Sequence, residues 1–94
     1  MVLNFRDTYH EVGDYEFKII LDPKRFKNGH RATIRMMNAD RKEVSLDVNR
    51  WGRKINCFFS INDDDPSGVY VVNFRINDDD GNEIDKTFHC WVIK

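Results

Sequence analysis

A five-residue sequence rich in carboxylates occurs twice in this chain: Ile-Asn-Asp-Asp-Asp fills residues 61–65 and again residues 76–80. Carboxylate oxygens are preferred ligands of Ca²⁺, which needs six to eight oxygens converging at about 2.4 Å. Residues 68–75, between the copies, have the pattern of one β-strand. Because a strand rises about 3.3 Å per residue, the copies should lie roughly 25 Å apart, at opposite ends of that strand. We therefore expect two acidic turns and not one pooled metal site.

The second copy has the better spacing for a metal ion, because Asp78, Asp80 and Asn82 alternate along the chain. Glu83, however, stands where an EF-hand loop requires glycine, so that match fails. Two interpretations are open. A calcium site built on these three residues would need ligands from another loop or a neighbouring domain. Otherwise the aspartates cap their own turns through backbone amides. No other cofactor is expected.

Basic and aromatic side chains gather in the middle of the sequence, where residues 24–54 hold ten of the fifteen Lys and Arg. Arginine forks donate paired hydrogen bonds to carboxylate or phosphate, and an indole ring offers a stacking face. The candidate binding residues are Arg25, Phe26, Lys27, Arg50, Trp51 and Arg53. The alternative is structural: Phe26 and Trp51 would fold back as lids over the core, since aromatic residues beside turns often pack.

Strands must position these groups, because apolar and polar residues alternate with a period of two along most of the chain. Gly, Pro, Asn and Asp mark the turns between the alternating segments. The predicted strands are residues 2–8, 14–22, 31–38, 43–49, 54–61, 68–77 and 83–93. Seven short strands with turns at this spacing predict an all-β, seven-stranded antiparallel β-sandwich.

Successive strands reverse direction, so their connections should alternate between the two ends of the sandwich. Residues 23–30, 49–53 and 77–82 would then share one end, and residues 9–13, 38–42 and 62–67 the other. The candidate binding residues and the second acidic copy fall at the first end. Loops at one end of a sandwich often form a binding surface.

Residues 65–72 (Asp-Pro-Ser-Gly-Val-Tyr-Val-Val), followed by Asp-Gly-Asn at 80–82 and a last strand ending at residues 91–93, resemble the C-terminal half of immunoglobulin-like modules. Such modules occur in multidomain surface and secreted proteins. Val72 stands where antibody-type domains have a cysteine. The resemblance implies an immunoglobulin-like, fibronectin-like or macroglobulin-like sandwich and no particular substrate. In an immunoglobulin-like arrangement, Cys57 and Cys90 would point inward from opposite sheets. A cross-sheet disulfide is one interpretation, and we favour two buried free thiols.

Several function classes are disfavoured by the sequence. Ninety-four residues make one domain, 1–94, and the last strand ends the chain, which favours a module excised from a larger protein. No nucleophile elbow, metalloprotease motif or phosphate-binding loop occurs, so we expect no enzyme. The net charge of −1 and the adjacent acidic turn argue against nucleic acid as a partner. No apolar run is long enough for membrane insertion.

Three hypotheses remain. The first is a non-catalytic interaction or spacer module of a larger extracytoplasmic or secreted protein, which contacts a neighbouring domain or another protein. The second is a carbohydrate-binding module with Trp51 as stacking platform and Arg50 and Asp78 as hydrogen-bonding neighbours. The third is an intracellular docking module with reduced cysteines. Apolar residues on outward faces would serve any docking function: Ile20, Met37, Phe58, Val71, Trp91 and Ile93.

Overall fold

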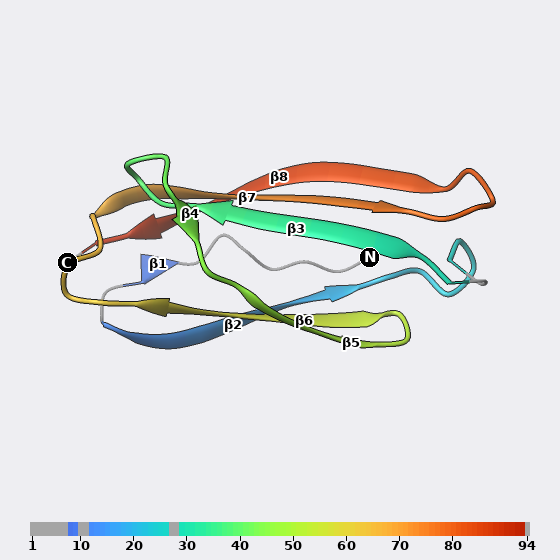
Figure 1. The fold of residues 1–94 in the computed structure, drawn as a ribbon, viewed down its shortest axis with the longest axis horizontal. Coiled ribbons are helices and arrows are strands. Elements are labelled where there is room, and N and C mark those ends of the chain that lie inside the picture. Colours follow the sequence, from blue (N-terminus) through green and yellow to red (C-terminus); the bar gives the residue numbers. More distant parts are fainter. Residues whose placement is uncertain (1–7, 10–11, 27–28, 94) are drawn as a thin grey trace.

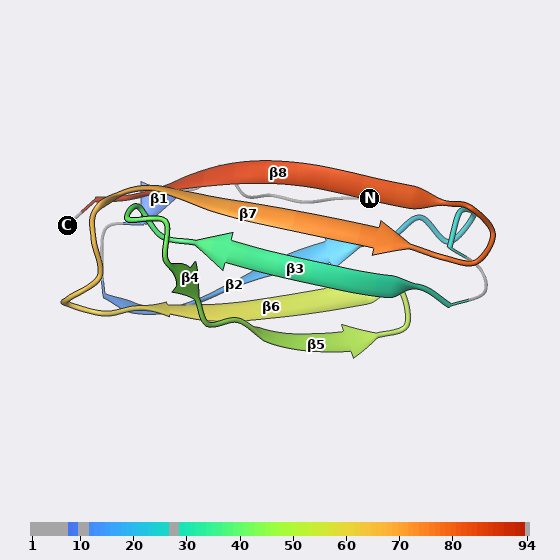
Figure 2. The same ribbon diagram turned by 45° about the horizontal axis from the view of Figure 1, so that its top comes forward.

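The computed structural model describes residues 8–9, 12–26 and 29–93, with only the backbone described for 8–9. Eight strand segments form two sheets that pack face to face (Figures 1 and 2). One sheet has the order β1-β8-β7-β3-β4, and the other has the order β2-β6-β5. The strands are β1 (Thr8–Tyr9), β2 (Gly13–Ile20), β3 (Arg31–Met37), β4 (Glu43–Val44), β5 (Asp47–Trp51), β6 (Lys54–Ile61), β7 (Gly68–Asn77) and β8 (Glu83–Val92).

The predicted seven-stranded sandwich is confirmed, with two differences in detail. The segment predicted as one strand, 43–49, is divided: β4 pairs with β3 in one sheet, and β5 pairs with β6 in the other. The short β1 pairs with β8 in parallel, while every other pair of described strands is antiparallel. Most of the predicted first strand, 2–8, lies outside the described residues.

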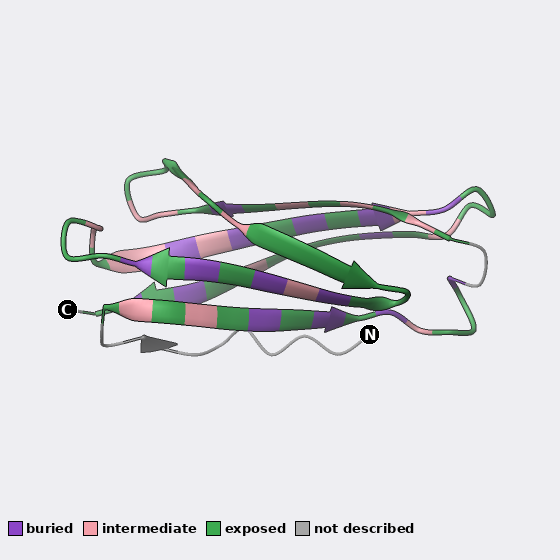
Figure 3. Cartoon of the chain, turned by 60° about the horizontal axis from the view of Figure 1, so that its bottom comes forward, coloured by how far each residue is buried: buried purple, intermediate pink, exposed green. Residues whose placement is uncertain are grey.

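Burial follows the alternation that the sequence predicts (Figure 3). The central strand β6 buries every second residue: Ile55, Cys57, Phe59 and Ile61. Its counterpart β7 does the same with Tyr70, Val72, Phe74 and Ile76. Each large apolar side chain buried in this way contributes about 1.5–3 kcal/mol to folding. The core therefore lies between β6 and β7, with Phe17 and Ile19 of β2 and Cys90 and Val92 of β8 beside them.

The division of residues 43–49 corrects one predicted core position. Alternation places Val48 on the inward face, but its side chain is 41% exposed, and all of β5 is exposed. The reason is topological, because β5 is the last strand of a three-stranded sheet. In the facing sheet, β3 pairs with β4 only at Met36 and Met37, so little of that sheet extends over β5.

Tyr70 fixes the corner where the chain crosses from β6 to β7. Its hydroxyl donates to the carbonyl oxygen of Pro66 at 2.8 Å, and its ring is 2% exposed. Burial, with help from Asp65, raises the pKa of Tyr70 to about 12, so the hydroxyl stays a donor. This is the tyrosine corner typical of immunoglobulin-like sandwiches, and it places Val72 at the usual cysteine position.

The corner also requires a glycine. Gly68 has φ 136°, and an added Cβ there would lie 2.9 Å from the Cβ of Ala39. Any other residue would be strained by its backbone angle and would collide with the 38–42 turn. The connections after β6 and after β3 thus pack together at one end of the 43 Å long molecule.

Both cysteines are buried on opposite sheets, and no disulfide joins them, as the favoured interpretation predicted. Burial raises the pKa of the Cys57 thiol to about 12. A thiol with this pKa is uncharged at neutral pH and is a poor nucleophile.

Candidate functional site

The three loops predicted to share one end do meet there, and arginines join them. Arg50 of β5 donates to the carbonyl oxygen of His30 at 2.8 Å, and Arg53 donates to that of Phe26 at 3.5 Å. Arg25 donates to the carbonyl oxygen of Glu83 at 3.4 Å. The guanidinium groups predicted to bind a ligand therefore also support the backbone of neighbouring loops. The sixth candidate, Lys27, lies outside the described residues.

Phe26 is a buried core residue. Asp22 ends the preceding strand by capping the amide of Lys24 at 2.8 Å, and its carbonyl accepts from the amides of Arg25 and Phe26. This tight turn directs the ring of Phe26 inward, where it is 1% exposed. Of the two interpretations of Phe26, the structure supports the lid over the core.

Trp51 behaves in the opposite way, since its side chain is 76% exposed. It ends the edge strand β5 and pairs with Lys54 across a two-residue hairpin. Gly52 occupies the first central position with φ 59°, which fits a type II′ turn. The interpretation of Trp51 as a lid over the core is therefore wrong.

Beside Trp51 lies a shallow depression of about 450 Å³. Ile20, 44% exposed, and Pro23 contribute apolar surface to it, and Arg53 and Lys54 contribute positive charge. Arg50 and Asp78, the predicted hydrogen-bonding neighbours of the indole, do not line this depression. Arg50 reaches across to the loop before β3, and Asp78 belongs to the turn after β7.

Asp78 acts as the cap of its own turn. Its Oδ1 accepts from the amides of Asp80 and Asn82, at 3.1 and 2.9 Å, and its Oδ2 accepts from the side-chain amide of Asn82 at 2.9 Å. These hydrogen bonds, the side-chain bond of Asn82 first, lower the pKa of Asp78. Asn82 in turn donates to the carbonyl oxygen of Arg25 at 2.7 Å. Within the described ranges, no group of three or more His, Cys, Asp or Glu could hold a metal ion. The hydrogen bonds of Asp78 support the capping interpretation.

A hollow of about 540 Å³ on the other side of the hairpin was not predicted. It is lined by Phe26, Gly29, His30, Arg50, Gly52 and Arg53. The sequence indicates Phe26, Arg50 and Arg53 as candidate binding residues but gives His30 no role. The one signal for His30 is its position, directly before a strand and within a basic segment.

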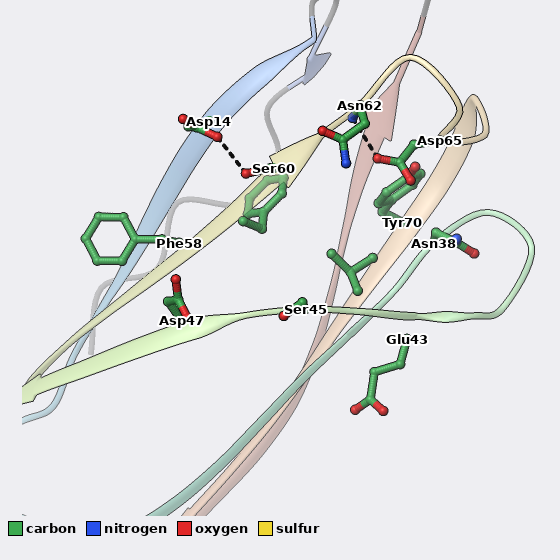
Figure 4. Close-up of a pocket in the computed structure, with 12 residues that line it drawn as sticks. Asp14, Asn38, Glu43, Ser45, Asp47, Phe58, Ser60, Asn62, Asp65 and Tyr70 are labelled. Atoms are coloured by element: carbon green, nitrogen blue, oxygen red, sulfur yellow. Dashed lines mark hydrogen bonds between the residues drawn. The ribbon is translucent and has the colours of Figure 1, made fainter.

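A second unpredicted hollow, of about 590 Å³, lies at the opposite end of the sandwich (Figure 4). Its carboxylates come from distant segments, which is why sequence reasoning missed it. Several are already engaged: Asp14 accepts from the Ser60 hydroxyl at 2.6 Å, and Asp65 accepts from the amide of Asn62 at 2.7 Å. Glu43 pairs with Arg35 at 3.4 Å.

The comparisons with known proteins agree with the fold. No protein-family model and no curated protein matches this sequence. CopC from Methylosinus trichosporium has a similar structure, with a TM-score of 0.60 at 18% identity, over 96% of this chain and 85% of that one. The M1 domain from titin matches with a TM-score of 0.57 at 11% identity, over 98% and 95% of the two chains. Titin M4 gives 0.51 at 11%, over 98% and 92%.

These likenesses show an immunoglobulin-like β-sandwich. At such low identity they establish the architecture alone, and the function has to be argued from the site. The described part of the chain contains no helix that could span a bilayer.

Proposed function

We propose that this chain is a non-catalytic interaction module of a larger extracytoplasmic protein, and that Trp51 anchors its partner. The observation that carries this proposal is the 76% exposure of the indole beside the apolar surface of Ile20 and Pro23. Tryptophan is enriched among residues that dominate the free energy of protein association. A large ring held out at the tip of a hairpin costs solubility unless another surface covers it.

The charges around Trp51 suggest the chemistry of the partner. Arg53 and Lys54 line the same depression, and the exposed Lys24 follows Pro23. We infer a protein surface with an apolar pocket for the indole and a rim of carboxylates. Rim charges of opposite sign accelerate encounter and fix orientation. The M1 domain, which shares this fold, is by its name a domain from titin, and a modular role suits the present chain as well.

Site-specific photo-crosslinking tests this function. A photoreactive amino acid at position 54, which lines the same depression and leaves Trp51 in place, should yield a discrete adduct with one protein of the source organism. Excess unlabelled wild-type chain should compete the adduct away, while excess Trp51→Ala should not. Trp91→Ala is the matched control, because Trp91 is also exposed, at 52%, but lies on β8. Competition by Trp51→Ala equal to that of wild type would contradict the proposal.

A carbohydrate-binding module is the second candidate, and the exposed indole supports it too, since sugar rings stack on such faces. The structure offers it fewer polar partners than the sequence suggested, because Arg50 and Asp78 are engaged elsewhere. A glycan array distinguishes the two candidates: retention of a glycan that is lost in Trp51→Ala would favour carbohydrate.

A further inference from the structure

The hollow between the loop before β3 and the β5–β6 hairpin gathers positive charge around a polar ring. Arg50 and Arg53 line it from the hairpin, and His30 lines it from the loop. Phe26 forms an apolar part of the wall and meets the imidazole edge-on, with ring centroids 5.9 Å apart. The Trp51 depression is a separate hollow, although Gly52 and Arg53 line both.

His30 is unusual in the surroundings of its two ring nitrogens. Both Nδ1 and Nε2 are buried, and no described residue provides a partner for either. A neutral imidazole has one donor and one acceptor nitrogen, and a protonated ring has two donors. Buried polar atoms in native proteins nearly always have a partner. Nitrogens with so little accessible surface cannot be touched from the hollow, so a ligand there would act on the ring through its charge.

The two arginines also retain hydrogen-bonding capacity. Arg50 uses Nη2 on the carbonyl oxygen of His30, and Arg53 uses Nη1 on that of Phe26. Each guanidinium carries five N–H donors, so further donors remain on both. Among the described residues, neither arginine forms an ion pair with a carboxylate. Paired guanidinium groups beside a histidine match the oxygens of a carboxylate or phosphate.

We propose that this hollow binds a small oxyanion, a carboxylate or a phosphate group, through Arg50 and Arg53, next to the ring of His30. The role is independent of docking at Trp51, which points to the other depression. The site would let the module hold an acidic group of a ligand next to its basic hairpin.

Binding of the anion should be coupled to protonation of His30. Burial lowers the pKa of His30, and Arg50 and Arg53 lower it further, while Asp78 of the facing turn opposes them. Among the described residues, Arg25 is a further charged group on this wall, with its guanidinium over the Phe26 ring at 5.7 Å. An oxyanion would offset the repulsion from the arginines and so favour the protonated imidazole. Affinity should therefore rise as the pH falls from about 8 toward about 5.5.

NMR of the imidazole Cε1–H signals tests the proposal on the wild-type chain. The pH is titrated in sodium chloride, sodium acetate and sodium phosphate at equal ionic strength. We expect acetate, phosphate or both to shift the His30 signal saturably and to raise its pKa by roughly 0.5 or more relative to chloride. Acetate alone would indicate a carboxylate ligand and phosphate alone a phosphate ligand. His89, exposed on β8, is the internal control. Equal His30 behaviour in all three salts would overturn the proposal.

Two variants check the residues. Arg53→Gln should weaken the apparent affinity of the active anion about tenfold or more. Arg31→Gln is the matched control, because Arg31 lies at the same end but pairs with Asp79 at 3.0 Å outside the hollow. An equal loss in Arg31→Gln would show a diffuse charge effect and refute a defined site. If Arg53→Gln does not fold, the wild-type titration still decides. Trp51→Ala should bind the anion normally, which separates this site from the docking function.

Discussion

The two copies of Ile-Asn-Asp-Asp-Asp end in different structures although their sequences are identical. In residues 61–65 the last aspartate is the cap: Asp65 accepts from the amide of Asn62 at 2.7 Å. In residues 76–80 the middle residue is the cap: Asp78 accepts from Asp80 and Asn82. The equivalent of Asp78 in the first copy is Asp63, which is exposed, whereas Asp78 is 7% exposed.

The connection that leaves each copy explains the difference. After the first copy, the chain crosses from β6 to β7 in the other sheet, and Pro66 leads into the corner fixed by Tyr70. After the second copy, Gly81 takes φ 85° and reverses the chain into β8 of the same sheet. The copies lie at opposite ends of the sandwich, as predicted (Figure 2). The local sequence supplies several side chains that could cap the turn, and the path of the following connection determines which of them does so.

The turn that has the same conformation as the second copy's turn has a different sequence. In residues 38–42, Asn38 Oδ1 accepts from the amides of Asp40 and Lys42, at 2.9 and 3.0 Å, just as Asp78 accepts from Asp80 and Asn82. Arg41 has φ 63° at the position that Gly81 occupies in the second turn. Two features define this turn: a side-chain acceptor at its first residue and a left-handed conformation at its fourth.

The largest difference between the copies should appear when their third residues are replaced. Asp78→Ala removes a buried carboxylate that accepts three hydrogen bonds, and it should lower Tm by roughly 10 °C. Asp63→Ala removes an exposed side chain and should change Tm by about 2 °C or less. Thermal unfolding followed by circular dichroism measures both. Similar losses in the two variants would mean that the copies are equivalent.

In the first copy, replacement of the fifth residue, Asp65, should cost more stability than replacement of its neighbour. Asp65→Ala removes the side-chain cap on Asn62 and should cost about 1 kcal/mol of unfolding free energy. Asp64→Ala, its exposed neighbour, should cost less than about 0.5 kcal/mol. Urea denaturation at neutral pH gives both values. A neutral Asp65→Ala would show that Tyr70 alone maintains this corner.

Replacement of the residue in the left-handed conformation tests whether turns 38–42 and 78–82 are structurally equivalent. Arg41→Gly should stabilise the chain by about 0.5–1 kcal/mol, because glycine adopts this conformation without steric cost. Gly81→Arg should destabilise it by a similar amount. Urea denaturation measures both changes, and a destabilised Arg41→Gly would indicate that the Arg41 side chain supports the turn.

Acid should affect the second copy more than the first. The folded-state pKa of Asp78 is lowered by its hydrogen bonds, so its contribution is complete above the unfolded pKa and is lost as pH falls through the folded pKa. Between about pH 5 and pH 2, Asp78→Asn should therefore lose less stability than wild type. Asp63→Asn should follow the wild-type curve, as measured by Tm at successive pH values.

Calcium should have the smallest effect. Asp78 uses both oxygens within its turn, and Asp79 pairs with Arg31. We expect about 5 mM CaCl₂ to change Tm by less than about 1 °C, since only a ligand that binds the folded state raises Tm. A saturable increase that is lost in Asp80→Asn would restore the calcium site.

The alternation of apolar and polar residues predicted most of the fold from the sequence alone. The alternation in β6 and β7 predicted their bounds and their buried residues, because each is a central strand with one face in the core. It failed at Val48, because alternation identifies a strand face but not whether a second sheet covers that face. The division of 43–49 into β4 and β5 depends on tertiary pairing, which no local pattern encodes.

The candidate site was only half predictable. The loop set was right because strand reversal alone determines which connections share an end. Phe26 and Trp51 look alike in the sequence, each beside a turn, and only the path of the backbone separates a 1% exposed ring from a 76% exposed one. His30 was missed because the burial of its nitrogens depends on tertiary packing, which no local pattern encodes.

The short pairing of β3 with β4 has a consequence for behaviour at high concentration. Within the described ranges, residues 31–35 have a hydrogen-bonded neighbour on the β7 side only. An open strand edge is a template on which another chain can add, and natural proteins discourage such growth with charge. Arg31 and Arg35 stand on this edge, each exposed and paired with an acidic residue. We expect that replacing both with threonine would turn this edge into a starting point for fibrils.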